Sequence, residues 1–580
     1  MIPQLWVELE ALPMPSNGKT DRRSLPVPDL SALSSEAYVA ASTSTEEVLV
    51  TIWQGLLGLE QVGVHDNFFE LGGHSLLATR LISMVRKELG IEITIKDAFT
   101  HSRLKDLAIY IDKQSKGTSL PAIVAQERPE LVPLSFSQER LWFLDQLQGS
   151  AEYHIPEIFA IYDTFDTAIL EKAINEVINR HEVLRTVYKE KDGVPYQEVL
   201  DKNRWKFESE IDVSDLEANE ISKIIEQEID KPFDLSKDHM LRITIVTGRR
   251  RQRQLIFTMH HIASDGWSHD ILMSELLSFY QNELKGTPIQ MPPLQVQYAD
   301  YSLWQRTYLS GEQLDRQLGY WVDQLSGVSP LNLPLDYTRP KEQSIKGESK
   351  TFTFSAALMK QLKVLSKDNE TTLFMTLLSA FKVLMYRYSG QEDICVGTPI
   401  ANREQEEIAG LIGFFVNTLA LRSDLGGNPK FLDLLSQVKQ MTLEAYQYQQ
   451  VPFEKVVNNV LQSRDMSRSP LFQVLFSMQD GVTSKIASPA DSGDIGLEPV
   501  LSEEHISKFD MSFTVTEFTD ELEVKITYCT DLFTARTIEQ IAMHFEQLLS
   551  SIVTTPKQNI DTLSMLTVEE QQKLAISFNE

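Results

Sequence analysis

Cysteine is scarce in this sequence, since its 580 residues include only Cys395 and Cys529. Two thiols that lie so far apart exclude a disulfide framework and a site built from four thiolates. We therefore expect a reducing compartment, the cytoplasm, and no bound metal.

Long apolar runs and basic charge are also in short supply. The first residues, Met1–Glu8, lack the basic and apolar stretches of a secretory signal, and no later segment has an apolar run of membrane length. The 54 Lys and Arg face 82 Asp and Glu, which gives a formal net charge of -28 and disfavours contact with nucleic-acid phosphates. The one dense basic run, Arg249–Arg253, lies between two apolar segments and predicts a solvated hairpin turn. We expect neither membrane insertion nor nucleic-acid binding.

The length predicts about three or four domains, and the first is helical. Ser44–Glu47 has the spacing of a capping box, and apolar residues then recur every four positions. A second helix opens at Ser75, and Gly90 is placed to end it. Residues 43–113 therefore predict a small helical bundle, and residues 114–130 have the composition of a linker.

The remainder mixes strands with amphipathic helices, of which Asp166–Arg180 has clear helical spacing. The apolar segment Leu255–Met259 predicts a short strand that runs directly into His260–Trp267, and an amphipathic helix follows. His261 and Asp265 are thus predicted to lie in a strand-to-helix connection, where scaffolds commonly expose reactive groups.

A serine directly before an apolar helix, such as Ser75, is usually a helix cap. Here the whole stretch Asp66–Leu77 is similar to the attachment motif of phosphopantetheine carrier domains. Gly72 and Gly73 permit a tight turn, and a helix N-terminus attracts a phosphodiester. The resemblance implies that Ser75 bears 4'-phosphopantetheine, donated from coenzyme A by a separate phosphopantetheinyl transferase, and that its thiol holds the donor chain as a thioester. Gly72, Gly73 and His74 would shape this site.

Two adjacent histidines at a strand end are more often structural than catalytic, so His260–Trp267 alone decides little. Six further motifs accompany it in a fixed order. Together the seven resemble the signatures of condensation domains of nonribosomal peptide synthetases, and they are most similar to those of tyrocidine synthetases. The six are Ser135–Trp142, Arg180–Thr186, Tyr298–Tyr301, Ile412–Thr418, Val451–Glu454 and Arg464–Phe472.

The resemblance implies a multidomain fold. It consists of an all-α four-helix carrier bundle followed by an α/β condensation domain, whose two lobes resemble chloramphenicol acetyltransferase and form a V. The segment Ser16–Arg23 is similar to the last motif of adenylation domains, with Lys19 as its lysine. The implied domains are an adenylation remnant and linker over 1–42, the carrier over 43–113, a linker over 114–130, the two condensation lobes over 131–304 and 305–561, and a linker towards a downstream adenylation domain over 562–580.

The implied reaction is attack of an acceptor amine on a donor thioester, which forms an amide bond. By resemblance, His261 projects into the channel and either accepts the amine proton or positions the amine, and the sequence leaves both roles open. The backbone N–H of Gly266 could face the developing oxyanion. His260 would be structural.

The carboxylate of Asp265 is implied to pair with an arginine of the other lobe, and Arg403 is the candidate. Such a pair would be architectural rather than catalytic. Asn417 either lines the channel or serves as a structural amide.

Two other functions share parts of this pattern, namely an epimerisation domain and a catalytically silent carrier-docking scaffold. The continuation Gly266–Ser268 favours condensation over epimerisation, and the intact His261 and Asp265 argue against a silent scaffold. The expected partners are the transferase with coenzyme A, an upstream adenylation domain and a downstream aminoacyl carrier, and we expect a monomer.

Overall fold

The computed structural model describes residues 38–73, 75–114, 121–162, 165–207, 209–248, 253–287, 291–463, 465–481, 497–500, 505–518 and 521–577. The chain divides into two compact units, Met1–Leu120 and Pro121–Glu580. The predicted adenylation remnant around Lys19 lies outside the described residues. Within the described part, no helix combines the length and the apolar character needed to cross a bilayer.

The first unit is a small bundle of helices. Its first helix begins at a capping box in which the Thr43 hydroxyl accepts from the Glu46 N–H, and the Glu46 carboxylate accepts from the Thr43 N–H. This box lies one residue before the predicted one. The helix ends at Gly58, whose φ of 66° is left-handed. The helices are α1 (Ser44–Leu57), α2 (Ser75–Leu89), α3 (Ile95–Thr100) and α4 (Leu104–Lys113).

Aromatic packing fixes the loop between α1 and α2 in this unit. Trp53 of α1 is fully buried, and its ring meets the Phe68 ring edge-on at a centroid distance of 5.0 Å. The backbone N–H of Phe68 donates to the carbonyl of Ser102 at 2.9 Å, which ties the loop to the start of α4. The predicted helical carrier bundle is confirmed.

The second unit begins with an anchored segment rather than a free linker. The carbonyl of Pro121 accepts hydrogen bonds from Trp304 Nε1 at 2.7 Å and from Gln405 Nε2 at 3.1 Å. Ile123 is 2% exposed, and Arg128 forms an ion pair of 2.7 Å with Glu182. The latter half of the predicted linker is therefore packed against the second unit.

A five-stranded sheet organises the first part of this unit. Antiparallel pairing of β6 with β7 confirms the predicted hairpin, although its turn residues, 249–252, lie outside the described residues. The predicted helix 166–180 is α6, which Asp166 caps. The sheet order is β12 (Leu497–Val500), β2 (His154–Ile161), β7 (Arg253–His260), β6 (Leu241–Thr247) and β5 (Ser209–Asp212). A small sheet beside it has the order β1 (Val132–Pro133), β4 (Val194–Val199) and β3 (Thr186–Lys191).

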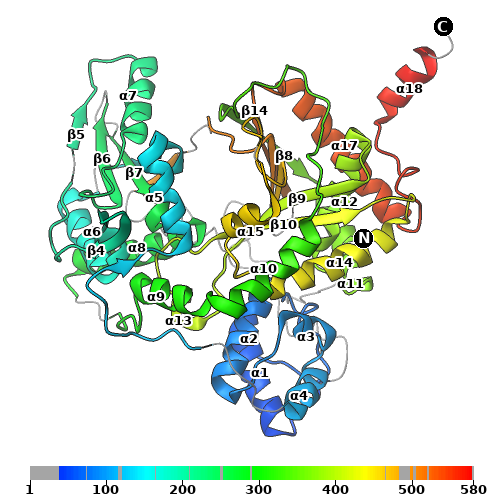
Figure 1. Cartoon of the computed structure of the whole chain (residues 1–580), viewed down its shortest axis with the longest axis horizontal. Coiled ribbons are helices and arrows are strands. Elements are labelled where there is room, and N and C mark those ends of the chain that lie inside the picture. The colour runs from blue at the N-terminus through cyan, green and yellow to red at the C-terminus, as the bar shows by residue number, and fades with distance from the viewer. Residues whose placement is uncertain are drawn as a thin grey trace, which may run out of the picture. The chain divides into compact units, whose positions relative to one another are not determined.

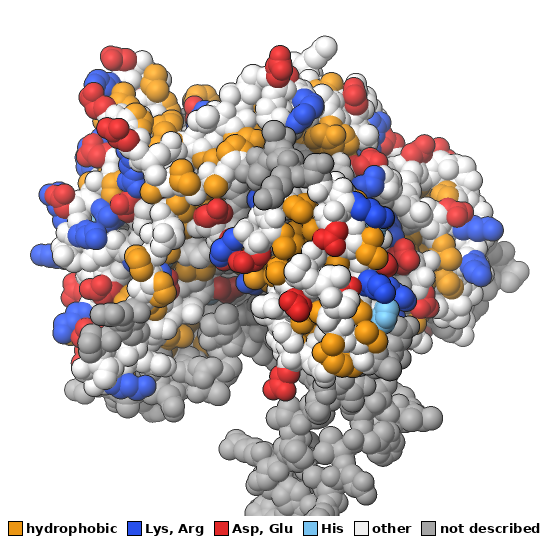
Figure 2. Space-filling model, turned by 90° about the horizontal axis from the view of Figure 1, so that it is seen from below, with side chains coloured by type: hydrophobic (Ala, Val, Ile, Leu, Met, Phe, Trp, Pro, Cys, Tyr) orange, Lys and Arg blue, Asp and Glu red, His pale blue; other side chains and the backbone are white. Residues whose placement is uncertain are grey.

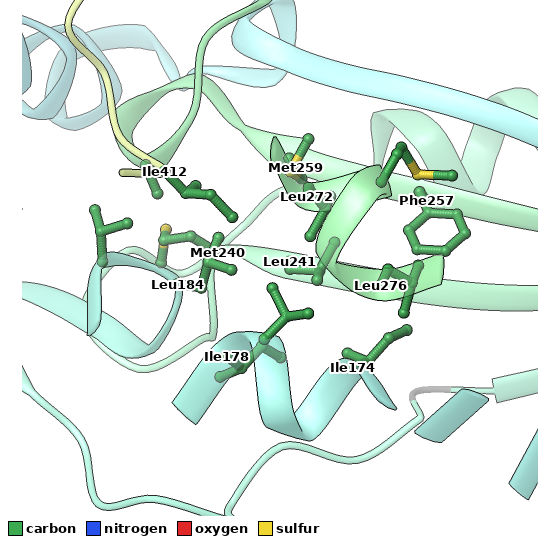
Figure 3. Packing of buried hydrophobic residues seen from close by; sticks show 14 of the residues in the cluster. Ile174, Ile178, Leu184, Met240, Leu241, Phe257, Met259, Leu272, Leu276 and Ile412 are labelled. Carbon is green, nitrogen blue, oxygen red and sulfur yellow. The ribbon is translucent and has the colours of Figure 1, made fainter. Parts of the chain in front are cut away.

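The core of this part lies between the sheet and two helices (Figure 3). Ile174 and Ile178 of α6 share one buried cluster with Leu276 of the helix after β7 and with Phe257 of β7. Ile412 enters the same cluster from a much later loop. Burying each such side chain contributes roughly 1.5–3 kcal/mol, so the cluster holds the end of β7 firmly in place.

A six-stranded sheet organises the later part of the unit. Helices α12, α14 and α17 lie along it (Figure 1), and α12 is buried from Met375 to Met385. Two separate sheets with helical cover confirm the predicted α/β class. The sheet order is β10 (Asn417–Asp424), β9 (Asp393–Ile400), β11 (Val474–Asp480), β13 (Met511–Glu517), β14 (Leu522–Cys529) and β8 (Gly347–Phe354).

The helices of the second unit are α5 (Phe136–Gln148), α6 (Thr167–Arg180), α7 (Ala218–Asp230), α8 (Gly266–Lys285), α9 (Tyr298–Tyr308), α10 (Gly311–Leu325), α11 (Ala356–Asp368), α12 (Leu373–Ser389), α13 (Glu406–Ala409), α14 (Phe431–Gln447), α15 (Phe453–Val460), α17 (Ala535–Thr554) and α18 (Val568–Ser577). Short 3-10 turns are η3 (Ala151–Tyr153), η4 (Glu182–Arg185) and η6 (His261–Ala263). On the face shown in Figure 2, acidic and basic side chains are interspersed rather than separated.

Candidate active site

The paired histidines lie where β7 passes into α8, as the sequence predicted. β7 ends at His260, the turn η6 starts at His261, and α8 begins at Gly266. Asp265 caps α8, because its carboxylate accepts from the Ser268 N–H at 2.9 Å. A strand, a tight turn and a capped helix therefore fix the backbone on both sides of His261.

The hydrogen bonding of His261 defines its tautomer. Its Nδ1 lies 2.9 Å from the carbonyl oxygen of Ser264. Because a carbonyl only accepts, Nδ1 carries the hydrogen and Nε2 keeps a lone pair. The ring rests against Phe414 at a centroid distance of 5.2 Å. Burial and the cation of Lys508 lower the pKa of His261 to about 4, so the imidazole is uncharged at neutral pH.

His260 differs from its neighbour because both of its ring nitrogens are occupied. Nδ1 accepts from the Ile262 N–H at 3.1 Å, and Nε2 lies 2.8 Å from the Ser150 hydroxyl. Ser150 in turn donates to Asp145. Burial holds the pKa of His260 well below its ordinary value. The ring is fully buried and offers no lone pair to a substrate.

The predicted ion pair between Asp265 and Arg403 is present, with Arg403 Nη2 3.1 Å from Asp265 Oδ1. Asp265 Oδ1 also accepts from the Ser268 hydroxyl at 2.7 Å, while Oδ2 accepts from the N–H groups of Phe415 and Val416 at 3.0 and 3.2 Å. Both partners are almost completely buried, at 2% and 5% exposure. Within the described residues this carboxylate accepts hydrogen bonds from backbone N–H groups, the Ser268 hydroxyl and Arg403 rather than from the imidazole, so Asp265 does not complete a triad with His261.

Gly266 is the first residue of α8, where backbone N–H groups lack partners inside the helix. A Cβ added at this position would meet no atom within 4 Å. Space beside the helix start is therefore open, as an approaching carbonyl group requires.

Asn417 begins β10 and is 7% exposed. Its amide nitrogen donates to the carbonyls of Gln449 and Val451 at 2.8 and 2.7 Å, and its oxygen accepts from the Phe453 N–H at 3.1 Å. These bonds favour a structural amide over a channel-lining residue, the two alternatives that the sequence left open.

Lys508 is a cation whose charge acts on His261 and which no sequence motif indicated. It lies in the loop before β13, far along the chain and outside the seven motifs, so no local pattern connects it with His261. Within the described residues, no group of three or more His, Cys, Asp or Glu side chains is placed to hold a metal ion.

The loop before α2 and the start of that helix suit an attached anion. Gly72 has a φ of 103°, which favours glycine, and a Cβ on Gly73 would lie 2.3 Å from the Phe68 ring. Ser75 opens a helix whose first turn carries no acidic residue, so its N-terminal N–H groups favour an anion. His74 and the side chain of Ser75 lie outside the described residues.

Two family models match the chain. The model described as "Condensation domain" matches residues 129–575, and the model described as "Phosphopantetheine attachment site" matches residues 47–111. Bacitracin synthase 3 of Bacillus licheniformis is 38% identical to the chain over 588 residues, which cover 100% of this chain and 9% of that protein. Gramicidin S synthase 2 of Brevibacillus brevis is 37% identical over 582 residues, with 100% and 13% covered. Tyrocidine synthase 3 of Brevibacillus parabrevis is 36% identical over 582 residues, with 100% and 9% covered. The chain thus spans about a tenth of the length of these relatives.

Solved structures share the fold of the second unit. The complex of the X-domain and OxyB from teicoplanin biosynthesis matches with a TM-score of 0.69 and 25% identity, over 78% of this chain and 99% of that one. The first condensation domain of the calcium-dependent antibiotic synthetase matches with a TM-score of 0.61 and 16% identity, over 76% and 100%. The chain belongs to the condensation-domain family, and a phosphopantetheine carrier domain precedes its condensation domain, as in nonribosomal peptide synthetases.

Proposed function

We propose that the carrier holds a donor acyl chain and that the condensation domain joins it to an acceptor amine as an amide. The observation that carries this proposal is His261, an uncharged imidazole beside the open start of α8, whose Nε2 has no hydrogen-bond partner in the described part of the chain. A neutral hydrogen-bond acceptor next to the first N–H group of a helix suits an amine that attacks a carbonyl group.

The site needs to position its substrates more than to activate them. A free α-amino group has a pKa near 8, so a useful fraction is already neutral at cytoplasmic pH. His261 Nε2 accepts a hydrogen bond from that amine, and this bond orients the lone pair of the amine nitrogen toward the donor carbonyl carbon. Because the low pKa makes His261 a weak base, we assign it a positioning role rather than full proton abstraction.

The proposed reaction needs no further reactant, because every bond that forms is matched by a bond that breaks. The C–N bond forms as the C–S bond of the donor thioester breaks, and one amine proton ends on the departing sulfur. The N–H at Gly266 donates to the carbonyl oxygen as it gains negative charge. Asp265 and Arg403 keep the start of α8 joined to the loop that carries Phe415.

Phosphopantetheine bound to Ser75 supplies a long arm with a terminal thiol that carries acyl groups. The residues of the chain that would hold it are the turn at Gly72 and Gly73 and the first N–H groups of α2. We further propose the domain division 1–42, 43–113, 114–130, 131–304, 305–561 and 562–580, in which the latter half of the segment 114–130 packs against the second unit. The proposed partners are a phosphopantetheinyl transferase, an upstream adenylation domain and a downstream aminoacyl carrier, for a monomer in the cytoplasm.

The test is chain transfer in a single turnover. The full chain is loaded at Ser75 with peptidyl-phosphopantetheine and mixed with an aminoacyl carrier, and mass spectrometry follows the elongated product. We expect rapid transfer that His261→Ala slows by about a hundredfold or more. His505→Ala, at an exposed position in the later part of the unit, is the matched control and should transfer normally.

The two alternatives give different results in the same assay. An epimerisation domain would exchange the donor α-hydrogen with deuterated solvent without any acceptor. A silent scaffold would transfer no faster than its His261→Ala variant, and this result would refute the proposal.

A further inference from the structure

The side chain of His260 caps the short turn that carries His261. Its Nδ1 accepts from the Ile262 N–H at 3.1 Å, so this bond spans the backbone of His261. The turn η6 itself adds the bond from the Ser264 N–H to the His261 carbonyl at 3.2 Å. Because a 3-10 turn of three residues has few internal bonds, the cap is one of the contacts that fix the position of His261.

The hydrogen bonds of His260 define its tautomer. A backbone N–H only donates, so Nδ1 carries no hydrogen and Nε2 carries it. Nε2 lies 2.8 Å from the Ser150 hydroxyl oxygen and donates to it. That hydroxyl lies 2.5 Å from Asp145 Oδ1 and donates in turn, because an ionised carboxylate only accepts. The bonds from Ile262 to Asp145 therefore all run in one direction.

The end of α5 brings Asp145 and Ser150 together. Asp145 lies in the last turn of α5, and its carbonyl accepts from the Gly149 N–H at 3.0 Å. Gly149 has a φ of 82°, a conformation that favours glycine and ends the helix directly before Ser150. Ser150 is 5% exposed and His260 is 0% exposed. Breaking a bond among these groups therefore leaves a buried polar atom without a partner, which costs more than the bond itself contributes.

A serine next to a histidine is also the arrangement of an activated nucleophile, but the order of the groups here is different. In a serine hydrolase the hydroxyl donates to the imidazole, and the carboxylate orients the other ring nitrogen. Here the carboxylate of Asp145 accepts from Ser150 itself. The Nε2 of His260 already carries a hydrogen and takes no proton from the hydroxyl. The three side chains thus fix the turn rather than attack a substrate.

Aromatic neighbours pack against the His260 ring. His154 and Phe233 meet it edge-on at centroid distances of 5.7 and 5.8 Å. His154 is itself fixed, because its Nδ1 donates to the Ile229 carbonyl at 2.7 Å. Burial holds the pKa of His260 well below its ordinary value, so the ring is uncharged at neutral pH. A charged ring would carry a hydrogen on Nδ1 and lose the cap.

We propose that Asp145 and Ser150 are positioning residues of the condensation centre, which orient the His260 imidazole so that its Nδ1 caps the turn and places His261 for the acceptor amine. This inference rests on the role proposed for His261. The nearest motif, Ser135–Trp142, ends before Asp145, so the sequence motifs did not indicate either residue.

The first measurement is single-turnover chain transfer by the loaded full chain. Asp145→Ala removes the acceptor of the Ser150 hydroxyl, and we expect it to slow transfer about tenfold because the turn loses its fixed position. Asp145→Asn keeps an acceptor oxygen and should stay within about twofold of the parent. Ser278→Ala is the control, because it removes a serine hydroxyl of α8 that donates only within its own helix, to the Ser274 carbonyl at 2.8 Å. Normal transfer by Asp145→Ala, or transfer by Asp145→Asn as slow as that of Asp145→Ala, would overturn the inference.

A second comparison separates positioning from packing. His260→Asn keeps a side-chain oxygen that accepts from the Ile262 N–H, but the shorter side chain ends before the Ser150 hydroxyl. Ser150→Ala should slow transfer about tenfold in the parent and cause no further slowing in the His260→Asn background. Equal slowing in both backgrounds would mean that Ser150 only packs, and the inference would be wrong.

The tautomer is measured without turnover, by NMR of the full chain labelled with isotopic nitrogen in histidine. Ring nitrogens with and without a hydrogen differ in chemical shift, and His260→Asn or, if it does not fold, His260→Gln identifies the signals. At neutral pH we expect Nδ1 without a hydrogen in the parent. In Asp145→Ala we expect a mixture, because the Ser150 hydroxyl is then free to donate to Nε2.

A parent protein whose His260 carries its hydrogen on Nδ1 would refute the inference, even where the transfer variants fail to fold. An unmixed signal in folded Asp145→Ala would refute it as well. Since this measurement needs no loaded carrier, its failure is distinct from that of a parent protein that transfers no chain.

Discussion

Lys382 is a lysine in the centre of a hydrophobic helix, and its burial should make stability depend on pH. The side chain is 0% exposed in α12, and Nζ donates to the Leu421 carbonyl at 2.8 Å and to the Ser423 hydroxyl at 2.7 Å. Burial lowers its pKa from 10.5 to about 7, while Cys395 and Asp393 oppose the shift.

The sign of the effect follows from proton binding. Between pH 7 and pH 9 an unfolded chain keeps Lys382 protonated, whereas in the folded protein the protonated fraction falls from about half to about one in a hundred. The unfolded state binds more protons, so the free energy of unfolding rises with pH in this window. Linkage gives an increase of about 2 kcal/mol from this one group.

The measurement compares the parent with Lys382→Met at pH 7 and pH 9. Urea unfolding is followed by hydrogen exchange of the peptide Leu373–Ser389, so that unfolding of the carrier does not enter the signal. The difference between parent and variant should shift in favour of the parent by about 2 kcal/mol at the higher pH. Packing effects of the methionine are the same at both pH values and cancel. Lys360→Met, at an exposed position of α11, is the control and should show no such shift. An equal difference at both pH values would refute the reasoning.

Three further predictions concern the two sites. Asp265→Asn leaves the buried Arg403 guanidinium uncompensated and should lower the free energy of unfolding by about 3–5 kcal/mol in urea titrations; a loss below about 1 kcal/mol would show that the pair is not structural. Gly73→Ala drives a methyl group into the Phe68 ring and should destabilise the carrier by about 1–3 kcal/mol, measured as a lower melting temperature of that unit, and an unchanged temperature would contradict the close approach. Ser75→Ala should abolish incorporation of label from coenzyme A by a phosphopantetheinyl transferase, and retained label would place the attachment elsewhere.

Local sequence patterns were sufficient for the elements that carry the site. The apolar period of α6, the strand before the histidines and the helix after them each depend on residues within a few turns of one another, and the structure contains all three. The ion pair of Asp265 and Arg403 was also predicted, but from family motifs rather than from any local rule.

Pairings between segments that lie far apart in the chain could not be predicted from the sequence. β12 pairs with β2 through Leu497 and Ile161, although neither segment carries a local signal for the other. The same holds for Lys508 and Tyr153, which meet although Tyr153 precedes β2 of the five-stranded sheet and Lys508 precedes β13 of the six-stranded sheet. Sequence motifs identify residues of the site, whereas its electrostatics depend on contacts that only the tertiary fold creates.

The loop from Ala409 to Val416 explains why the site needs both parts of the second unit. Trp267 Nε1 donates to the Ala409 carbonyl, the Ile412 N–H donates to His181 Nδ1, and Asp265 accepts from Val416. These bonds come from the beginning of α8 and from the end of α6, and they hold Phe414 against His261.

The proposed catalytic role and the architectural role therefore belong to neighbouring residues. The hydrogen bonds of Asp265 hold the loop and Arg403, whereas Nε2 of His261 keeps the lone pair that the proposed reaction would use. A variant that loosens the loop would lower chain transfer without any chemical role of its own, because Phe414 would no longer rest against the His261 ring.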